Sequence, residues 1–307
     1  CNLITAYQTM LPSSLKIKTQ KANYTKYDKY VELKVSKKAV LEFIETHRGK
    51  KVDILERLLS EEKVLKSEFD NVAIRELEKL GFVEITLTEK YRINHVLKNK
   101  TTLKLNEKQQ KVFDTILNAF HTNQTFLLYG VTGSGKTLCY IKLIEEVLKQ
   151  NKTALLLVPE ISLTEQIIKI FYDNFGSDVA ILHSGLSVGE KYDEYRKILN
   201  GEVHIVVGTR SAVFAPLENI GIIIIDEEHS DTYKQDSTPR YHARDIALER
   251  SKMHQCPLIL GSATPSLESM ARASKNVYTL VTLNKRANNQ ELPKVQIVDM
   301  AGEMQKR

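Results

Sequence analysis

The stretch FLLYGVTGSGKT, residues 126–137, decides the fold. An apolar run leads into Gly130, and the residues from there to Thr137 fit the pattern G-x-x-x-x-G-K-[ST]. A stretch with helical spacing of apolar residues, 138–150, follows directly. This order of strand, glycine-rich loop and helix predicts a phosphate-binding loop. Glycines let backbone N–H groups turn toward an anion at the positive end of a helix dipole.

The same loop supplies candidate nucleotide-binding residues. Lys136 is expected to reach the β- and γ-phosphates of ATP and to act in catalysis, and the Thr137 hydroxyl is expected to hold Mg²⁺. The alternative is a tight strand-to-helix turn that binds nothing. The candidate loop residues are Gly130, Val131, Thr132, Gly133, Ser134, Gly135, Lys136 and Thr137.

Length and composition describe a globular chain. The 307 residues are 42% hydrophobic and 27% charged, which suits two domains with sizeable cores. The longest strongly apolar run, 222–225, is too short to cross a bilayer, and residues 1–20 do not resemble a signal peptide, so no membrane role is expected. Three widely separated cysteines give no disulfide framework, which favours a cytoplasmic protein.

Positive charge is concentrated near the N-terminus. Residues 1–38 hold eight lysines and two acidic residues, which indicates either an anionic partner or a solvated basic linker. Tyr24, Tyr27 and Tyr30 alternate with lysines there. Stacking on single-stranded nucleic acid is possible, and half-buried strand tyrosines are the favoured interpretation.

Residues 36–98 predict a small separate domain. Three amphipathic stretches, each with the spacing of a helix, precede the alternating segment 82–93, which we interpret as a hairpin. Three helices and a hairpin is the order of a winged helix. Because the exposed face of the third helix is acidic, we favour a protein contact or spacer over DNA reading. The acidic residues are Glu68, Asp70, Glu76 and Glu78.

From residue 105 onward, helical stretches alternate with near-continuous apolar runs. Runs of this kind are typical of a parallel sheet that is buried on both faces, so we expect a doubly wound α/β domain. Strands are expected near 126–130, 153–158, 179–183, 203–208, 221–226, 258–262 and 277–281. Helices are expected near 107–121, 137–150, 162–175, 189–200, 241–254 and 266–274.

The motif Asp226-Glu227-Glu228-His229 follows the apolar run 222–225, and its first two acids are the candidate site residues. They lie at the carboxyl end of an expected strand, the edge where open α/β sheets bind ligands. Asp226 is the candidate Mg²⁺ ligand, and Glu227 is the candidate residue that orients and deprotonates the attacking water. The alternative is an acidic cap for the next helix.

Three further motifs end expected strands at the same edge: VPEISLTEQ at 158–166, GTRS at 208–211 and SAT at 262–264. Each one alone fits helix capping about as well as function. Arg210, Ser262 and Thr264 are candidates for contact with DNA or for coupling to it.

In order, these motifs resemble those of superfamily 2 nucleic-acid helicases. The segments 158–166, 182–229, 233–235, 240–247 and 260–269 resemble the first motor lobe, a RecA-like domain, of the bacterial replication-restart helicases. The resemblance covers residues 105–300 densely and the expected winged helix more loosely. MLPSSLKI at 10–17 resembles the end of that family's N-terminal DNA-binding domain.

The resemblance implies roles for further residues. LNEKQ at 105–109 matches the family's LNxxQ, which implies that Gln109 reads adenine. Residues 233–244 correspond to an aromatic-rich loop that senses single-stranded DNA and signals to the ATPase site, and His229 would couple the acids to it. The candidate loop residues are Tyr233, Lys234, Arg240, Tyr241 and Arg244.

The family also implies a domain plan. Residues 1–35 would end the DNA-binding domain, 36–100 form the winged helix, 101–285 the first motor lobe and 286–307 the start of a truncated second lobe. The chain is expected to be part of a longer protein. The arginine finger of the second lobe and the zinc-binding cysteines of the family are expected beyond residue 307, so this chain should hold no zinc.

The implied activity is that of an ATP- and Mg²⁺-dependent 3′→5′ DNA helicase that acts at stalled forks and loads the replicative helicase. Its implied partners are single-stranded and forked DNA, primosome proteins and single-stranded DNA-binding protein, at the bacterial nucleoid. The chain alone is expected to bind ATP and DNA but to unwind poorly. The alternatives are another superfamily 2 motor, such as an RNA helicase or a restriction translocase, and a nucleotide-gated winged-helix regulator.

Overall fold

The computed structural model describes residues 3–11, 15, 24–93 and 104–284. The chain divides into two compact units. One comprises Cys1–Met10, His95–Gly185 and Lys197–Arg307, and the other comprises Leu11–Asn94 and Leu186–Arg196. Most of the 10–17 motif and all of the expected second-lobe segment, 286–307, lie outside the described residues.

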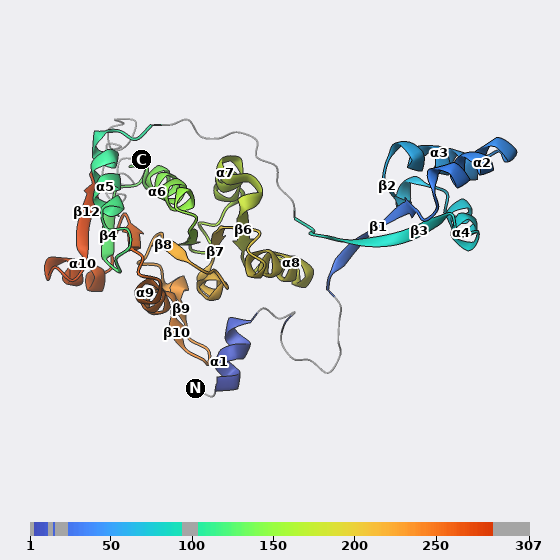
Figure 1. Ribbon diagram of the computed structural model, residues 1–307. Helices are drawn as coiled ribbons and strands as arrows, with labels where there is room; N and C mark the ends of the chain where they lie inside the picture. The colour runs from blue at the N-terminus through green and yellow to red at the C-terminus, as the bar shows by residue number, and fades with distance from the viewer. Residues whose placement is uncertain (1–2, 12–14, 16–23, 94–103, 285–307) are drawn as a thin grey trace, which may run out of the picture. The chain divides into compact units, whose positions relative to one another are not determined.

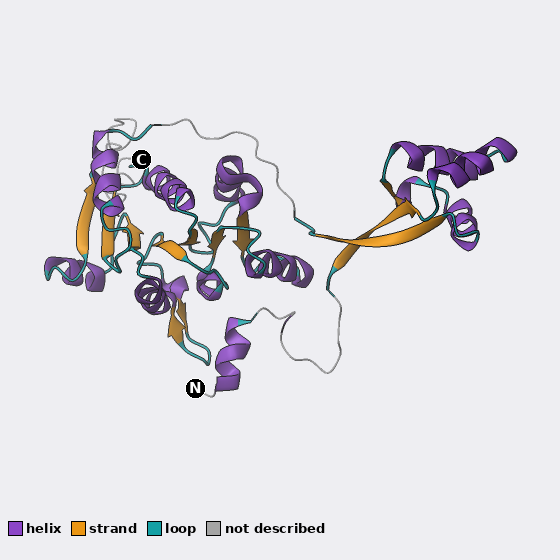
Figure 2. Ribbon diagram, viewed as in Figure 1, coloured by secondary structure: helices purple, strands orange, loops and turns teal. Residues whose placement is uncertain are grey.

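The first unit is built on a seven-stranded sheet with the order β12-β4-β11-β8-β5-β7-β6 (Figures 1 and 2). Every neighbouring pair is parallel. The α/β, RecA-like doubly wound sheet expected from the apolar runs is therefore confirmed. The strands are β4 (Thr125–Gly130), β5 (Thr153–Leu157), β6 (Val179–Leu182), β7 (Ile205–Gly208), β8 (Ile220–Ile225), β11 (Leu258–Ser262) and β12 (Thr279–Leu283).

Helices cover both faces of this sheet, and alternate strand residues divide between two cores. In β8, Ile222 and Ile224 pack into one core, while Ile223 and Ile225 pack into the other. This explains why the strand is apolar at every position. Side chains of α5 (Glu107–Leu117), α6 (Lys136–Lys149) and α7 (Glu165–Phe175) enter the first core. Side chains of α9 (Ala243–His254) and α10 (Leu267–Ser274) enter the second.

The remaining elements assigned mainly to the first unit are shorter. They are α1 (Leu3–Met10), β9 (Lys234–Gln235) and β10 (Tyr241–His242), and β9 pairs with β10 in an antiparallel ribbon. Helix α8 (Val188–Leu199) begins in the second unit and ends in the first. The described part of the chain contains no helix that is both long and apolar enough to cross a membrane.

The second unit combines three helices with an antiparallel sheet of order β2-β1-β3. Its core forms around Val31, Leu55 and Ile74, which are fully buried. The elements are β1 (Lys26–Leu33), α2 (Lys37–Thr46), α3 (Lys50–Ser60), β2 (Lys63–Leu65), α4 (Asn71–Lys79) and β3 (Val83–Lys90). The three expected helices are confirmed. Tyr27 and Tyr30 lie in a strand, as we favoured, but only Tyr30 is half-buried, whereas Tyr27 is 38% exposed.

The expected hairpin at 82–93 is wrong. Val83–Lys90 is one continuous strand, and its partner is β1, with Val31 opposite Ile85. A period-two pattern specifies a half-buried strand but not the segment with which it pairs.

The acidic face of α4 is balanced by cations of α3. Asp70 pairs with Lys50 at 2.9 Å, and Glu76 pairs with Lys51 at 2.7 Å. Glu68, just before α4, lies 2.6 Å from Arg57. These exposed pairs add little stability. They do mean that this surface is less negative than its acidic residues alone suggest.

Candidate nucleotide site and its surroundings

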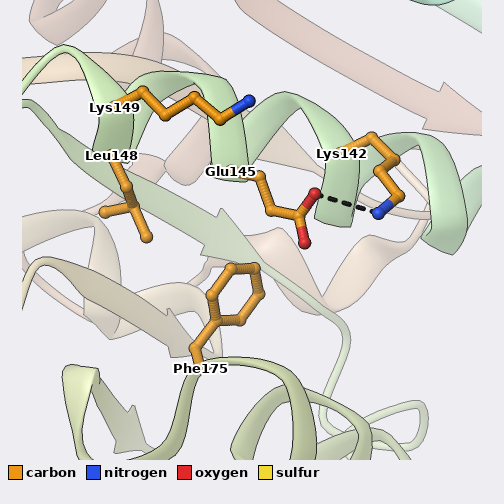
Figure 3. Close-up of a pocket in the computed structure, with 5 residues that line it drawn as sticks. All are labelled: Lys142, Glu145, Leu148, Lys149 and Phe175. Atoms are coloured by element: carbon orange, nitrogen blue, oxygen red, sulfur yellow. Dashed lines mark hydrogen bonds and ion pairs between the residues drawn. The ribbon is translucent and has the colours of Figure 1, made fainter. Parts of the chain in front are cut away.

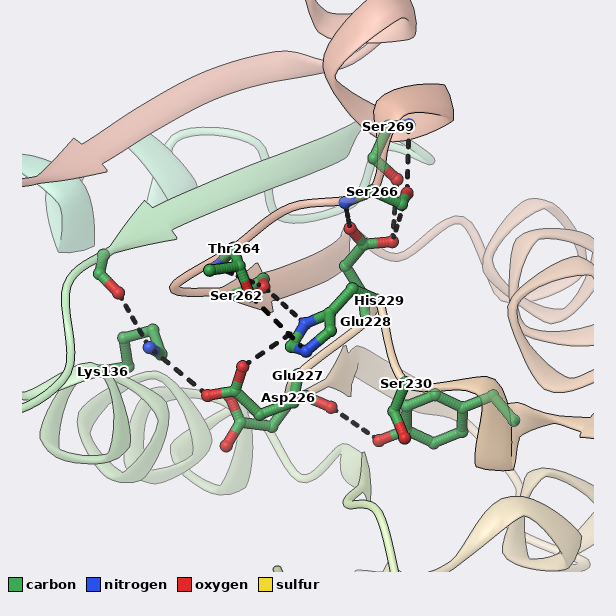
Figure 4. Close-up of polar contacts among 12 residues, drawn as sticks. Lys136, Asp226, Glu227, Glu228, His229, Ser230, Ser262, Thr264, Ser266 and Ser269 are labelled. Carbon is green, nitrogen blue, oxygen red and sulfur yellow. Dashed lines mark hydrogen bonds and ion pairs between the residues drawn. The ribbon is translucent and has the colours of Figure 1, made fainter. Parts of the chain in front are cut away.

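The phosphate loop leaves β4 and leads into α6, as the motif predicts. Gly133 and Gly135 have φ angles of 77° and 84°, a left-handed conformation that side chains disfavour. The Lys136 side chain folds back along the loop, and its Nζ donates to the carbonyl of Gly130 at 2.8 Å (Figure 4). Lys136 is only 9% exposed, so its charge lies inside the loop rather than in solvent.

Several features of the loop suit a phosphate. Gly135, at the N-cap of α6, offers no capping side chain, which leaves the first helical N–H groups available to an anion. The buried Ser134 Oγ has no hydrogen-bond partner among the residues that the structure describes. A Cβ on Gly130 would lie 2.8 Å from that oxygen. The loop thus combines donors, a buried cation and close backbone approach.

The other candidate loop residues line its edges. Val131 N donates to the carbonyl of Leu283 in β12 at 3.3 Å, and Thr132 is exposed. Thr137, the candidate Mg²⁺ ligand, is half-buried in the first turn of α6.

The two expected acids lie beside this loop. Asp226 N donates to the carbonyl of Leu157 at 2.9 Å, which holds the end of β8 against β5. The next residue, Glu227, has a φ of +45°, and its Oε1 lies 3.6 Å from Lys136 Nζ (Figure 4). Burial, followed by the neighbouring Glu227 charge, raises the pKa of Asp226, which a nearby cation would counteract.

His229 joins the acids to the SAT segment. Its Nδ1 lies 2.8 Å from Ser262 Oγ and 3.6 Å from Glu227 Oε2, and its Nε2 lies 3.5 Å from Thr264 Oγ1. Ser262 Oγ also accepts from Thr264 N at 2.9 Å. Residues from the ends of β8 and β11 therefore meet at one edge, as their sequence positions predict.

The Gln109 carboxamide, which the resemblance assigns to adenine, is already hydrogen-bonded within the protein. It is 2% exposed, its Oε1 accepts from Asn106 N at 2.9 Å, and its Nε2 donates to the carbonyl of Ser134 at 2.9 Å. The carboxamide completes a capping box at α5 and braces the phosphate loop. Its role toward adenine stays a prediction.

The candidate DNA loop has a buried and an exposed part. Tyr233 is 1% exposed and donates its hydroxyl to the carbonyl of Asp226 at 2.6 Å, so its ring is not available for stacking on bases in this conformation. Half-buried Tyr241 packs edge-on against Phe214, with ring centroids 5.0 Å apart. By contrast, Lys234 and Arg240 are exposed, and the Arg240 Nε donates to the carbonyl of Asp236 at 3.0 Å.

Arg210 braces the loop from the GTRS motif. Its Nη1 donates to the carbonyl of Lys234 at 2.6 Å and to that of Thr232 at 3.3 Å. These contacts position the backbone of the loop. Any contact of Arg210 with nucleic acid stays a prediction.

Comparison with known proteins shows a family to which this chain is related. A family model described as "Type III restriction enzyme, res subunit" matches residues 102–267, over half of the chain. The chain belongs to this family.

Curated proteins named replication restart protein PriA are also similar. That of Bacillus subtilis (strain 168) is 49% identical over 244 residues, which cover 78% of this chain and 30% of the relative. That of Chlamydia trachomatis serovar D is 37% identical over 322 residues, covering 100% of this chain and 42% of the relative. These matches confirm the resemblance to the replication-restart helicases. The chain spans less than half the length of these relatives.

Solved structures with a similar fold include RecG bound to a three-way DNA junction and the UvsW helicase from bacteriophage T4. The first is 21% identical with a TM-score of 0.43, over 65% of this chain and 27% of that chain. The second is 14% identical with a TM-score of 0.42, over 84% of this chain and 97% of that chain.

Three functional candidates were missed by the sequence reasoning: Tyr140, Glu228 and Gly261. Tyr140 Oη donates to Asp226 Oδ1 at 3.0 Å, and a Cβ on Gly261 would lie only 1.8 Å from that hydroxyl. Glu228 is 3% exposed and points away from Lys136 (Figure 4). The third acid of the 226–229 motif was a visible signal for Glu228. The partners of all three lie far away in the sequence.

A pocket on α6 lies apart from the phosphate loop. It is lined by Lys142, Glu145, Leu148 and Lys149 of α6 and by Phe175 at the end of α7 (Figure 3). Lys142 Nζ and Glu145 Oε2 pair within it at 2.9 Å. The lining residues from α6 all lie beyond the first turn of this helix, whereas the phosphate loop is at its N-terminus, so this pocket is not the candidate nucleotide site.

Proposed function

We propose that this chain forms the first motor lobe of an ATP-dependent DNA helicase that restarts replication at stalled forks. One observation carries the proposal: Lys136 and Glu227, 91 positions apart, lie with Nζ and Oε1 3.6 Å from each other, beside Asp226 at the carboxyl edge of the sheet. A lysine for phosphate and a carboxylate for water at one strand edge suit phosphoryl transfer to water.

The chemistry of each side chain suggests its role in hydrolysis. The N–H groups at the start of α6, the Ser134 hydroxyl and the Lys136 ammonium would bind the phosphates. Glu227 would orient the attacking water and accept its proton. This mechanism forms no covalent intermediate with the enzyme. Mg²⁺, held by Thr137 and Asp226 and completed by phosphate oxygens, would neutralise charge on the phosphates. Among the described residues, no group of three His, Cys, Asp or Glu is arranged to hold a metal by itself, and a site shared with phosphate needs none.

The finer assignments extend this proposal. Gln109 reads adenine after releasing one of its present hydrogen bonds. Lys234 and Arg240, the exposed cations of the loop, contact the DNA backbone. The second unit is a winged helix. The whole protein moves 3′→5′ on single-stranded DNA in the cytoplasm and meets forked DNA, single-stranded DNA-binding protein and primosome proteins. The relatives named as replication restart proteins support the role in replication restart.

The decisive experiment compares cofactors for ATP hydrolysis by the full-length protein that carries this sequence. The rate is measured with Mg²⁺ alone, with single-stranded DNA, with duplex DNA and with RNA, and unwinding is measured on forks with a 3′ or a 5′ single-stranded arm. We expect strong stimulation by single-stranded DNA and unwinding from the 3′ arm. Equal stimulation by RNA would instead indicate another superfamily 2 motor. ATP binding without DNA-stimulated hydrolysis would indicate a nucleotide-gated regulator.

A further inference from the structure

Glu228 is a buried carboxylate that the proposed chemistry does not use. It directly follows Glu227, yet its side chain points to the opposite side, toward the start of α10 (Figure 4). Its Oε1 accepts from Ser266 N at 2.7 Å, and its Oε2 accepts from Ser266 Oγ at 3.2 Å and from Ser269 Oγ at 2.8 Å. Ser266 is itself the N-cap of α10. The third acid therefore anchors the 226–229 motif to that helix.

The same carboxylate reaches the candidate DNA loop through Arg244. Arg244 Nη1 lies 3.5 Å from Glu228 Oε2 and donates to Ser269 Oγ at 3.4 Å. The side chain of Arg244 is 15% exposed and that of Glu228 is fully buried. Arg244 is the second residue of α9. Its backbone N–H donates to Nδ1 of His242, the N-cap residue of this helix. Arg244 thus faces the interior, where it links the loop to Glu228.

Separating Glu228 from Arg244 would cost free energy. A buried charge that loses its partner keeps its desolvation penalty without compensation. Glu228 N also donates to the carbonyl of Gly261 at 3.0 Å, so its backbone is tied to β11 as well. The start of α9, the start of α10 and the 226–229 motif are therefore held in one arrangement by Glu228.

Glu227 lies between two anchored neighbours. On one side, Asp226 is held by Leu157, Tyr140 and Tyr233. On the other side, Glu228 is held by the α9 and α10 contacts. Because Glu227 itself has a left-handed φ of +45°, its side-chain direction depends on where both neighbours are held. A displacement of Arg244 would reach Glu227 through a single peptide unit.

We propose that Glu228 is the positioning residue that transmits the state of the 233–244 loop, through Arg244, to the catalytic Glu227. This inference rests on the proposed function, since it concerns the stimulation of hydrolysis by DNA. Glu228 touches neither nucleotide nor water in this scheme. The second link from the loop, the Tyr233 hydroxyl on the Asp226 carbonyl, acts on the other neighbour of Glu227.

The test uses Glu228→Gln in the full-length protein. Glutamine keeps the size and one oxygen acceptor for Ser266 N but removes the charge that faces Arg244. We expect the ratio of the hydrolysis rate with saturating single-stranded DNA to the rate without DNA to fall by about tenfold or more. DNA affinity, measured by fluorescence anisotropy, is expected to stay within about twofold of the wild-type value. Arg244→Gln should lower the ratio similarly, and the double variant should lower it no further.

Asp178→Asn is the matched control. Asp178 Oδ1 accepts from His204 N at 2.9 Å and contacts His204 Nδ1 at 2.6 Å, so it too is a carboxylate that links two segments. It precedes β6 and therefore lies at the amino edge of the same sheet, away from the site. We expect this change to lower stability without changing the stimulation ratio.

The outcomes separate a relay from a structural contact. A Glu228→Gln protein that melts at a lower temperature but keeps the wild-type stimulation ratio overturns the inference alone. A wild-type protein without any stimulation overturns the proposed function, and the inference with it. Should Glu228→Gln fail to fold, Ser269→Ala removes the hydrogen bond that Ser269 Oγ donates to Glu228 and the one that it accepts from Arg244, and leaves the ion pair in place. That variant must then lower the ratio measurably, or the inference is wrong.

Discussion

The hydroxyl of Tyr140 donates a hydrogen bond to Oδ1 of Asp226 at 3.0 Å, so the helix of the phosphate loop holds the acid at the end of β8. Tyr140 lies one turn after Lys136 on α6 and is fully buried. The strand β11 runs between β4 and β8 in the sheet. The tyrosine therefore reaches across β11, where Gly261 leaves space for it.

Tyr140→Phe is expected to weaken the candidate metal site and the fold together. The variant leaves a buried carboxylate without its hydroxyl donor, which typically costs about 1.5–3 kcal/mol. Urea denaturation should show this loss of unfolding free energy. A Mg²⁺ titration of nucleotide binding should show a higher half-saturating concentration. An unchanged Mg²⁺ requirement would show that Tyr140 does not position Asp226.

Gly261→Ala is expected to destabilise the protein through a clash. The new Cβ would lie 1.8 Å from Tyr140 Oη, and overpacking of a buried site costs about 1–3 kcal/mol. Gly261→Ala should lower the unfolding free energy less in the Tyr140→Phe background, because the clashing oxygen is absent there. A double-mutant cycle on unfolding free energy measures this coupling. Strict additivity would contradict the contact.

Lys136→Ala is expected to abolish DNA unwinding while leaving fork binding largely intact. The lysine lies inside the phosphate loop, and the exposed cations of the candidate DNA loop are other residues. Gel-shift and unwinding assays on the same fork give the two readouts. Parallel loss of both activities would place Lys136 in the DNA-binding surface or in the folding of the lobe.

Glu227→Gln is expected to slow hydrolysis without preventing ATP binding. The amide cannot accept a proton from water, and loss of a general base typically lowers the rate by about 10²–10⁴-fold. Single-turnover hydrolysis and equilibrium binding of a fluorescent ATP analogue separate the two effects. Weakened binding with an unchanged hydrolysis step would assign Glu227 to phosphate contact instead.

Two histidines are expected to make the first unit sensitive to acid. His242 and His254 each accept a backbone N–H through Nδ1, from Arg244 and Ile220 respectively. Burial, followed by a nearby arginine, lowers the pKa of both. The unfolded chain therefore binds protons more readily than the folded one. Their stabilising contribution is complete above about pH 6.5 and is lost as the pH falls through the lowered pKa values.

Thermal unfolding between pH 7.5 and pH 5 measures this dependence. His242→Asn keeps an acceptor for Arg244 N but does not titrate, so it should flatten part of the pH dependence. His254→Asn should flatten another part, and the double variant should show both effects. A wild-type protein whose unfolding free energy rises toward pH 5 would contradict the direction of these pKa shifts.

Much of the first unit could be predicted from local patterns. Continuous apolar runs such as 222–225 predicted strands buried on both faces, and the phosphate motif predicted a loop between β4 and α6. Parallel strands present their carboxyl ends at one edge, so Asp226, His229 and Ser262 could be grouped before any contact was known. These inferences depend on backbone periodicity and chain direction, which are local properties.

Other features depend on contacts that local patterns do not specify. The alternating stretch 82–93 specified a strand, but its partner β1 is more than 50 positions earlier. Gln109 matched a motif, yet its carboxamide is engaged by Asn106 and Ser134. Tyr233 belonged to an aromatic segment, and burial against the core directs its hydroxyl to Asp226.

The sequence by itself determined the phosphate loop at 126–137, the order of strands and helices, and the edge where the acids lie, because glycine positions and hydrophobic periodicity act over a few residues. Only the tertiary structure decided that Glu227 faces Lys136 while Glu228 turns to Ser266 and Arg244. Two adjacent carboxylates are equivalent in a sequence. They differ in the fold because packing places Lys136 beside Glu227, and Arg244 together with buried serine donors around Glu228.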